Sequence, residues 1–215
     1  GFGDVGYNAS EIRTPTLDLL AAKGQTLNRY YAYPVCSPTR AALMTGRSAL
    51  TIGVDMPLGI GEGLPLDEKL LPEMLREAGY QTLMVGKWHL GSHDTRYFPH
   101  NRGFDYYYGN LEGGVDYYSR VTSLSDSLDW QRNGSSVIEE GYTTDLLTDD
   151  AIRLIGEMDR DRPFFLYLAY TAPHTPIQPP PGNLISHYSD IQDESRRSYA
   201  AMVESLDTSI ARIVS

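Results

Sequence analysis

The sequence predicts an α/β domain in which helices flank a mostly parallel sheet, and three observations support this. Residues 14–24 carry the start and stop signals of a helix, and residues 147–158 repeat apolar side chains at helical spacing. Residues 81–85 and 164–170 are short and apolar, as strands are. Segments of the two kinds therefore alternate, which is typical of a domain whose functional sites gather at the carboxyl ends of its strands.

The helices are predicted from their ends and their periods. Thr14 suits the N-cap position, Pro15 the first helical position, and Gly24 follows the end. A second helix is expected over residues 72–78, closed by Gly79. Two longer helices follow from apolar side chains three or four positions apart, which are Leu147, Ala151, Leu154, Ile155 and Met158 in one and Tyr199, Met202, Val203, Leu206, Ile210, Ile213 and Val214 in the other.

The strands are predicted from apolar runs between turn signals. Residues 81–85 favour β-structure and run into Gly86, so a strand that ends in a loop is expected there. Residues 106–130 are rich in aromatic side chains, Gly and Ser without a clear period, which predicts loops and short strands. Pro163 precedes the continuous apolar run 164–170, which is typical of a strand buried on both faces of a parallel sheet.

Residues 1–215 are predicted to form a single, truncated domain. Neither an initiator Met nor a signal peptide precedes Gly1, and the last predicted helix reaches the end without a Gly or Pro stop signal. Further residues are therefore expected before and after this sequence. The proline-rich residues 179–182 are interpreted as a stiff surface turn and not as a domain boundary.

Composition and charge argue against several classes of protein. The chain has 18 Lys and Arg against 28 Asp and Glu, a formal net charge of −10. It has no basic run, so we expect no binding to nucleic acid or to an anionic membrane. No apolar stretch approaches the roughly 20 residues of a membrane-spanning helix. A single cysteine allows neither an internal disulfide nor a Cys-based zinc site.

Three short segments that follow predicted structural breaks contain most of the reactive side chains. In the first, Pro38 suits the opening turn of a helix that continues through residues 41–44, so Cys36 is expected at a helix N-terminus, where backbone N–H groups attract anions. Arg40 adds a cation one turn further on. A lone cysteine is also often a small buried hydrophobic residue, and that alternative stays open.

The second and third segments contribute a lysine and two histidines. Lys87 and His89 are two positions apart, so they would share one face if the strand continued, with Trp88 on the other. A lysine holds negative charge and a histidine moves protons near neutral pH, which suits a site for an oxyanion. His174 lies between two prolines after the second predicted strand. Each residue alone also fits a packed or surface role, but their conjunction favours a catalytic site.

Two signatures in this chain resemble those of the type I sulfatases. Residues 36–40 read CSPTR and match C-x-P-x-R, and residues 86–91 read GKWHLG. The similarity runs through nearly the whole chain and is closest to the arylsulfatase B group, the N-acetylgalactosamine-4-sulfatases and their near relatives. It implies the alkaline-phosphatase-like sulfatase fold, here as an N-terminal fragment that lacks the first strand. The other matching segments are residues 12–15, 65–72, 77–80, 102–105, 116–119, 164–169 and 191–193.

The resemblance also implies a role for each candidate residue. In this family the cysteine of C-x-P-x-R is oxidised to formylglycine by the formylglycine-generating enzyme and then hydrated. Cys36 would thus become the nucleophile and one ligand of Ca²⁺, and Arg40 would orient the resulting diol. Lys87 would contact the diol and the sulfate, and His89 would be the base that drives sulfate elimination. His174 would bind the sulfate ester and help to protonate the leaving alcohol.

The remaining family features are expected partly outside this sequence. The carboxylates that hold calcium would lie beyond its ends, and Asp149 and Asp150 are interpreted as a solvated helix face instead. Asn8 and Asn133 each begin an Asn-x-Ser pattern, which predicts N-glycosylation and is consistent with passage through the secretory pathway. The resemblance implies a lysosomal or extracellular location. For Asn133, followed by Gly134, simple turn chemistry is the alternative.

The expected function is hydrolysis of a sulfuric ester in a sulfated sugar or an aryl sulfate. N-acetylgalactosamine 4-sulfate in glycosaminoglycans is one candidate substrate. Two alternatives stay open: a non-catalytic sulfatase-like binding protein, and a phosphomonoesterase or phosphonate hydrolase of the same superfamily. The intact C-x-P-x-R pattern disfavours the second of these.

Overall fold

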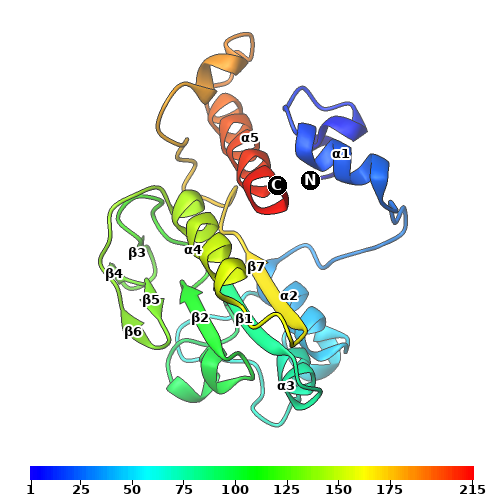
Figure 1. Cartoon of the computed structure of the whole chain (residues 1–215). Helices are drawn as coiled ribbons and strands as arrows, with labels where there is room; N and C mark the ends of the chain where they lie inside the picture. The colour runs from blue at the N-terminus through cyan, green and yellow to red at the C-terminus, as the bar shows by residue number, and fades with distance from the viewer.

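The computed structural model describes residues 1–215, with helices arranged around a central sheet (Figure 1). The α-helices are α1 (Pro15–Lys23), α2 (Cys36–Thr45), α3 (Leu71–Glu77), α4 (Thr143–Glu157) and α5 (Glu194–Val214). The strands are β1 (Gln81–Gly86), β2 (Tyr106–Gly109), β3 (Val121–Thr122), β4 (Ser127–Leu128), β5 (Gln131–Arg132), β6 (Ser135–Ser136) and β7 (Phe164–Ala169). No helix is both long and apolar enough to cross a bilayer.

The main sheet has the strand order β6-β5-β2-β1-β7, and a separate hairpin is formed by β3 and β4. Strand β1 is parallel to both of its neighbours, with Leu83 opposite Tyr106 of β2 and Gly86 opposite Ala169 of β7. Strands β5 and β6 extend the other side in antiparallel fashion. The predicted α/β class with a mostly parallel sheet is therefore confirmed, and β1, β2 and β7 end at one edge.

The side chains of β1 alternate between two hydrophobic cores, one on each face of the sheet. Met84 belongs to the core that includes buried side chains of α2 and Tyr107 of β2. Leu83 and Val85 belong to the other core, which includes Leu147 of α4. Helix α4 thus covers one face and α2 lies against the other, while α1 and α5 lie together near both termini (Figure 1).

Two element predictions need correction. Helix α4 begins at Thr143, not near Leu147, because the polar residues of its first turn lie outside the apolar period from which the helix was predicted. Strand β7 ends at Ala169, and its side chains contact both hydrophobic cores, but those before Ala169 are not fully buried and Phe164 is 50% exposed. Within these residues β7 pairs with β1 alone.

The adjacent residues Asp149 and Asp150 of α4 lie in two different environments. Asp149 is exposed and forms an ion pair with Arg212 of α5. Asp150 is buried and accepts hydrogen bonds from Tyr106, Arg132 and Arg153. The expected solvated face is therefore wrong for Asp150, because it lies on the side of α4 that packs on the sheet near the start of β2.

The N-terminus of α1 is capped by a residue distant in sequence. Thr14 holds the N-cap position, as predicted, but its hydroxyl bonds the Gly6 amide and Asp18 instead of the helix amides. The carboxylate of Asp207 on α5, which is buried, accepts from the amides of Thr16 and Leu17 at 3.0 and 2.8 Å. Asp207 therefore connects α5 to α1.

Replacing Asp207 by alanine is expected to reduce the free energy of unfolding by about 2 kcal/mol, because two buried amides lose a charged acceptor. Asp207→Asn keeps one acceptor oxygen and should have a smaller effect. Urea unfolding of the full-length protein measures both changes. An unchanged midpoint for the alanine variant would show that water replaces this cap fully.

Candidate active site

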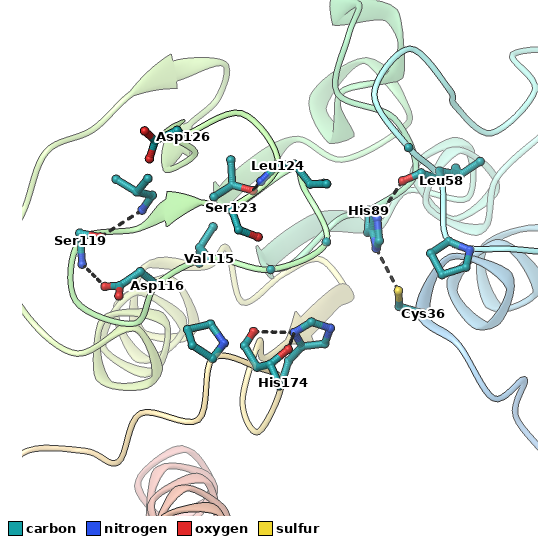
Figure 2. Close-up of a pocket in the computed structure, with 18 residues that line it drawn as sticks. Cys36, Leu58, His89, Val115, Asp116, Ser119, Ser123, Leu124, Asp126 and His174 are labelled. Carbon is teal, nitrogen blue, oxygen red and sulfur yellow. Dashed lines mark hydrogen bonds between the residues drawn. The ribbon is translucent and has the colours of Figure 1, made fainter.

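The predicted reactive residues come together where the parallel strands end. Cys36 is the first residue of α2, as expected from the sequence. Lys87 and His89 directly follow β1, and His174 lies in the loop after β7. Figure 2 shows Cys36, His89 and His174. This position agrees with the rule that sites in such sheets form at the carboxyl ends of the strands.

Strand β1 ends in a loop, as predicted, and so does not continue through the signature. It ends at Gly86, where the backbone has φ +115° and a Cβ atom would lie 2.1 Å from the carbonyl oxygen of Ala169. The chain then turns, and His89 itself has φ +54°. Lys87 and His89 therefore meet at the site because of this turn, not because they share one face of a strand, and Trp88 packs into the core.

His89 makes two hydrogen bonds that fix the role of each ring nitrogen. Its Nε2 lies 3.1 Å from the carbonyl oxygen of Leu58, and its Nδ1 lies 3.0 Å from Sγ of Cys36 (Figure 2). A carbonyl oxygen can only accept, so Nε2 of the neutral ring carries the proton. The unprotonated Nδ1 then faces residue 36 as an acceptor.

Ser37, which the sequence did not single out, supports this arrangement. Its hydroxyl donates to the carbonyl of His89 at 2.9 Å and accepts from the amide of Leu58 at 3.0 Å. Ser37 thus fixes Leu58 relative to His89. Because Ser37 directly follows Cys36, it also links Leu58 and His89 to the start of α2.

The site contains cations that are removed from bulk water. Lys87 is 2% exposed, and burial, followed by the nearby charge of Arg40, lowers its pKa to about 8. Cys36 acts on this pKa in the opposite direction. Arg40 is half-buried and donates to the carbonyl of Lys87 and, at 3.2 Å, to the hydroxyl of Tyr167 on β7. Tyr167 is a further residue that the sequence analysis missed.

His89 is kept neutral by its surroundings. Burial, with a smaller contribution from the charge of Lys87, lowers its pKa to about 4. Its ring is available as an acceptor at neutral pH for this reason, in agreement with the Leu58 hydrogen bond that leaves Nδ1 unprotonated.

A histidine whose folded-state pKa is depressed destabilises the protein as the pH falls. Below about pH 6.5 the unfolded chain binds a proton at His89, whereas the folded protein does so only near pH 4. We expect a loss on the order of 3 kcal/mol in the free energy of unfolding across this interval. An NMR titration of the ring in the full-length protein, assigned with His89→Gln, checks this. A midpoint near 6.5 would contradict it.

His174 lines the same cavity as Cys36 (Figure 2). Its ring is exposed, and Nδ1 is 2.7 Å from the carbonyl oxygen of Thr175. The main-chain carbonyl of His174 accepts from the hydroxyl of Tyr117 at 2.9 Å, which holds the loop in place. His174 is therefore positioned to reach a group bound between it and residue 36.

The cavity between these residues has a volume of about 780 Å³. One wall carries the catalytic candidates Cys36, His89 and His174, and the other is formed by lining residues between 113 and 126, which include β3 and the turn that leads to β4 (Figure 2). Apart from the matching segment 116–119, nothing in the sequence indicated that this region lines a site. The polar side chains of this second wall are Asp116, Ser119, Thr122, Ser123 and Asp126.

The family model described as Sulfatase matches residues 1–215. This chain belongs to the sulfatase family. The predicted membership of the type I sulfatases is thereby confirmed.

Curated relatives of this sulfatase are similar over its whole length. Mouse arylsulfatase J is 40% identical over 222 residues, which cover 99% of this chain and 37% of the relative. Human N-acetylgalactosamine-6-sulfatase is 34% identical, with coverage of 100% and 44%. The chain thus spans less than half the length of these relatives, and the predicted similarity to the arylsulfatase B group in particular stays a prediction.

A solved structure has the same fold. The sulfatase resembles Ps i-CgsB with a TM-score of 0.91 and 37% sequence identity, covering 100% of this chain and 51% of that one. A second structure shows Ps i-CgsB in complex with k-i-k-neocarrahexaose. The predicted alkaline-phosphatase-like fold is therefore confirmed for the sulfatase.

The residues present do not by themselves form a calcium site. Calcium prefers six to eight oxygen ligands, whereas Cys36 is surrounded by the nitrogen groups of Arg40, Lys87 and His89. None of the 215 residues contributes to a group of three or more His, Cys, Asp or Glu side chains arranged to hold a metal. Calcium binding stays a prediction from the family resemblance.

The two predicted glycosylation sites differ in their surroundings. Asn133 and Gly134 form the two-residue connection between β5 and β6, with φ of +49° and +84°, and the Asn133 side-chain oxygen accepts from the Tyr107 amide at 2.8 Å. Asn133 and Gly134 therefore form a tight turn, which was the alternative interpretation of this Asn-x-Ser pattern. The Asn8 amide donates to the carbonyl of Phe2 at 2.9 Å. Glycosylation at both positions stays a prediction.

Proposed function

We propose that the full-length protein hydrolyses sulfate esters, with residue 36 as the nucleophile after oxidation of Cys36 to formylglycine. The observation that carries this proposal is the 3.0 Å contact between residue 36 and Nδ1 of His89, whose other nitrogen is occupied by the carbonyl of Leu58. A nucleophile next to an oriented base, with cations close by, is the arrangement that transfer of a sulfuryl group requires.

Each residue has a separate chemical task in this proposal. Hydrated formylglycine supplies one hydroxyl that attacks sulfur and a second whose deprotonation releases sulfate. Nδ1 of His89 accepts the proton of the second hydroxyl. Lys87 and Arg40 neutralise the charge on the sulfuryl oxygens, and His174 gives a proton to the departing alcohol. The net reaction converts a sulfate ester and water into an alcohol and sulfate.

A sulfated sugar is the substrate class that we propose. The carboxylates and hydroxyls on the second wall of the cavity can hydrogen-bond sugar hydroxyls, and about 780 Å³ is enough for a sugar ring. The named relatives support this class, since one is an N-acetylgalactosamine-6-sulfatase and another is bound to an oligosaccharide. N-acetylgalactosamine 4-sulfate is retained as one substrate to test. Passage through the secretory pathway, to the lysosome or the extracellular space, belongs to the same proposal.

The proposal is tested with the full-length protein made in a host that contains formylglycine-generating enzyme. Peptide mass mapping should find residue 36 as formylglycine, and an aryl sulfate should be hydrolysed in preference to the matching aryl phosphate. Sulfate binding without turnover of any ester would instead support the non-catalytic alternative. Preference for the phosphate ester would support a phosphomonoesterase.

A further inference from the structure

The segment of residues 110–114, directly after β2, touches both histidines of the site. A Cβ atom on Gly113 would lie 2.7 Å from Cε1 of His89, and one on Gly114 would lie 3.0 Å from Nδ1 of His174. The backbone of this segment therefore packs directly on both imidazole rings. A displacement of the segment would change the space available to each ring.

The same segment determines where the backbone of His89 lies. The amide of His89 donates to the carbonyl of Leu111 at 2.9 Å, and the amide of Trp88 donates to the carbonyl of Asn110 at the same distance. These two bonds join the turn that follows β1 to the segment that follows β2. His89 has a positive φ, so its orientation depends on these partners more than it would in a regular strand.

A second set of contacts ties the segment to the loop of His174. The side chain of Asn110 is 0% exposed, donates to the carbonyl of Glu112 at 2.8 Å and accepts from the hydroxyl of Thr171 at 3.1 Å. The carbonyl of Thr171 in turn accepts from the amide of His174 at 3.0 Å. The segment thus connects the loops that follow β1, β2 and β7.

One buried carboxylate anchors this segment from outside the cavity. Asp129 is 7% exposed; Oδ1 accepts from the amide of Leu111 at 2.9 Å and Oδ2 from the amide of Glu112 at 2.7 Å. It forms no ion pair with a basic side chain. A buried carboxylate whose only partners are backbone amides is costly to keep charged. Burial accordingly raises the pKa of Asp129 to about 6.

We propose that Asp129 is a positioning residue, whose two hydrogen bonds to Leu111 and Glu112 hold residues 110–114 against the rings of His89 and His174. Through the Leu111 carbonyl it sets the direction in which Nδ1 of His89 faces residue 36. Asp129 reaches neither residue 36 nor the cavity, so it acts only through this segment. The proposal rests on the proposed function of His89 and adds a residue to it.

Asp129→Asn in the full-length protein tests the proposal, because the amide keeps one acceptor but turns an N–H donor toward a backbone amide. We expect kcat to fall about 10- to 100-fold with KM changed less than about threefold, since geometry in the transition state is lost and not binding. Hydrogen exchange of amides 110–114 should become at least about tenfold faster. Asp150→Asn, a buried carboxylate near the start of β2, is the matched control and should change neither.

A second variant tests the close approach without touching the carboxylate. Gly113→Ala adds a methyl group against His89 and should lower kcat and shift the NMR signal of the His89 ring. Gly156→Ala on α4, where a Cβ atom would meet nothing within 4 Å, is its control.

Different outcomes separate the positioning role from the proposed function. Wild-type kcat and unchanged exchange of residues 110–114 in Asp129→Asn would overturn the positioning role. If the unsubstituted protein shows no sulfatase activity, the proposed function fails, and the exchange and NMR measurements still decide whether Asp129 holds the segment.

Discussion

Replacing Cys36 by alanine is expected to lower turnover of an aryl sulfate by at least about 1,000-fold, because no other nucleophile can take its place. The hydroxyl of the next residue, Ser37, already donates to the carbonyl of His89 and accepts from the amide of Leu58. The surrounding cations would still bind sulfate. Steady-state kinetics of the full-length variant measure the loss, and retention of more than about a tenth of the wild-type rate would contradict it.

Cys36→Ser is the matched control for this variant. Serine places one hydroxyl near Nδ1 of His89, so attack on sulfur remains chemically possible. It lacks the second hydroxyl on the same carbon, so sulfate has no route of departure by collapse to an aldehyde. We expect at most one turnover per active site. Sustained turnover by the serine variant would show that formylglycine is not required.

Replacing Lys87 by methionine is expected to reduce kcat/KM by about 100- to 1,000-fold, as loss of one preorganised charge at a transition state does. Methionine keeps most of the length of the side chain and removes its ammonium group. The fold should not suffer, because Lys87 is 2% exposed and its charged form is disfavoured by burial and by Arg40. The midpoint of thermal unfolding of the variant is expected to stay unchanged or to rise.

Measuring kcat/KM together with the thermal midpoint of Lys87→Met distinguishes a loss of catalysis from a loss of folding stability. Lys69→Met is the control, since Lys69 is exposed and pairs only with Glu77 on the surface; it should leave kcat/KM unchanged. If Lys87→Met lowered the midpoint and kcat/KM together, Lys87 would be a structural residue and its assigned contact with sulfate would be wrong.

The sequence was a good guide where local pattern and burial agree. The Pro15 start of α1, the strand after Tyr80 and the long helix α5 all have a period or punctuation of their own. For β7 the strand and its contact with both cores were predicted, but not its partial burial, because an apolar run does not show how closely the neighbouring layers cover a strand. The prediction also placed the start of α4 too late, since Thr143 and Thr144 are buried but do not belong to an apolar period.

The site was predictable as a set of residues but not as a geometry. Cys36, Lys87, His89 and His174 carry recognisable chemistry, and the carboxyl ends of parallel strands bring such residues together. The orientation of His89 depends instead on main-chain partners such as the Leu58 carbonyl. A carbonyl or a glycine has no distinctive side chain, so these contacts leave no signal in a sequence without the fold.

The separation of the site residues along the chain has a consequence for biosynthesis. His174 follows Cys36 by 138 positions (174 minus 36), and the wall that carries Gly113 and Gly114 is made in between. At about 5–20 residues per second, roughly 7–28 s pass between the synthesis of Cys36 and that of His174. During that interval the thiol belongs to a nascent chain without an enclosed cavity. A modifying enzyme that acts on residue 36 therefore meets an accessible peptide first and a folded site only later.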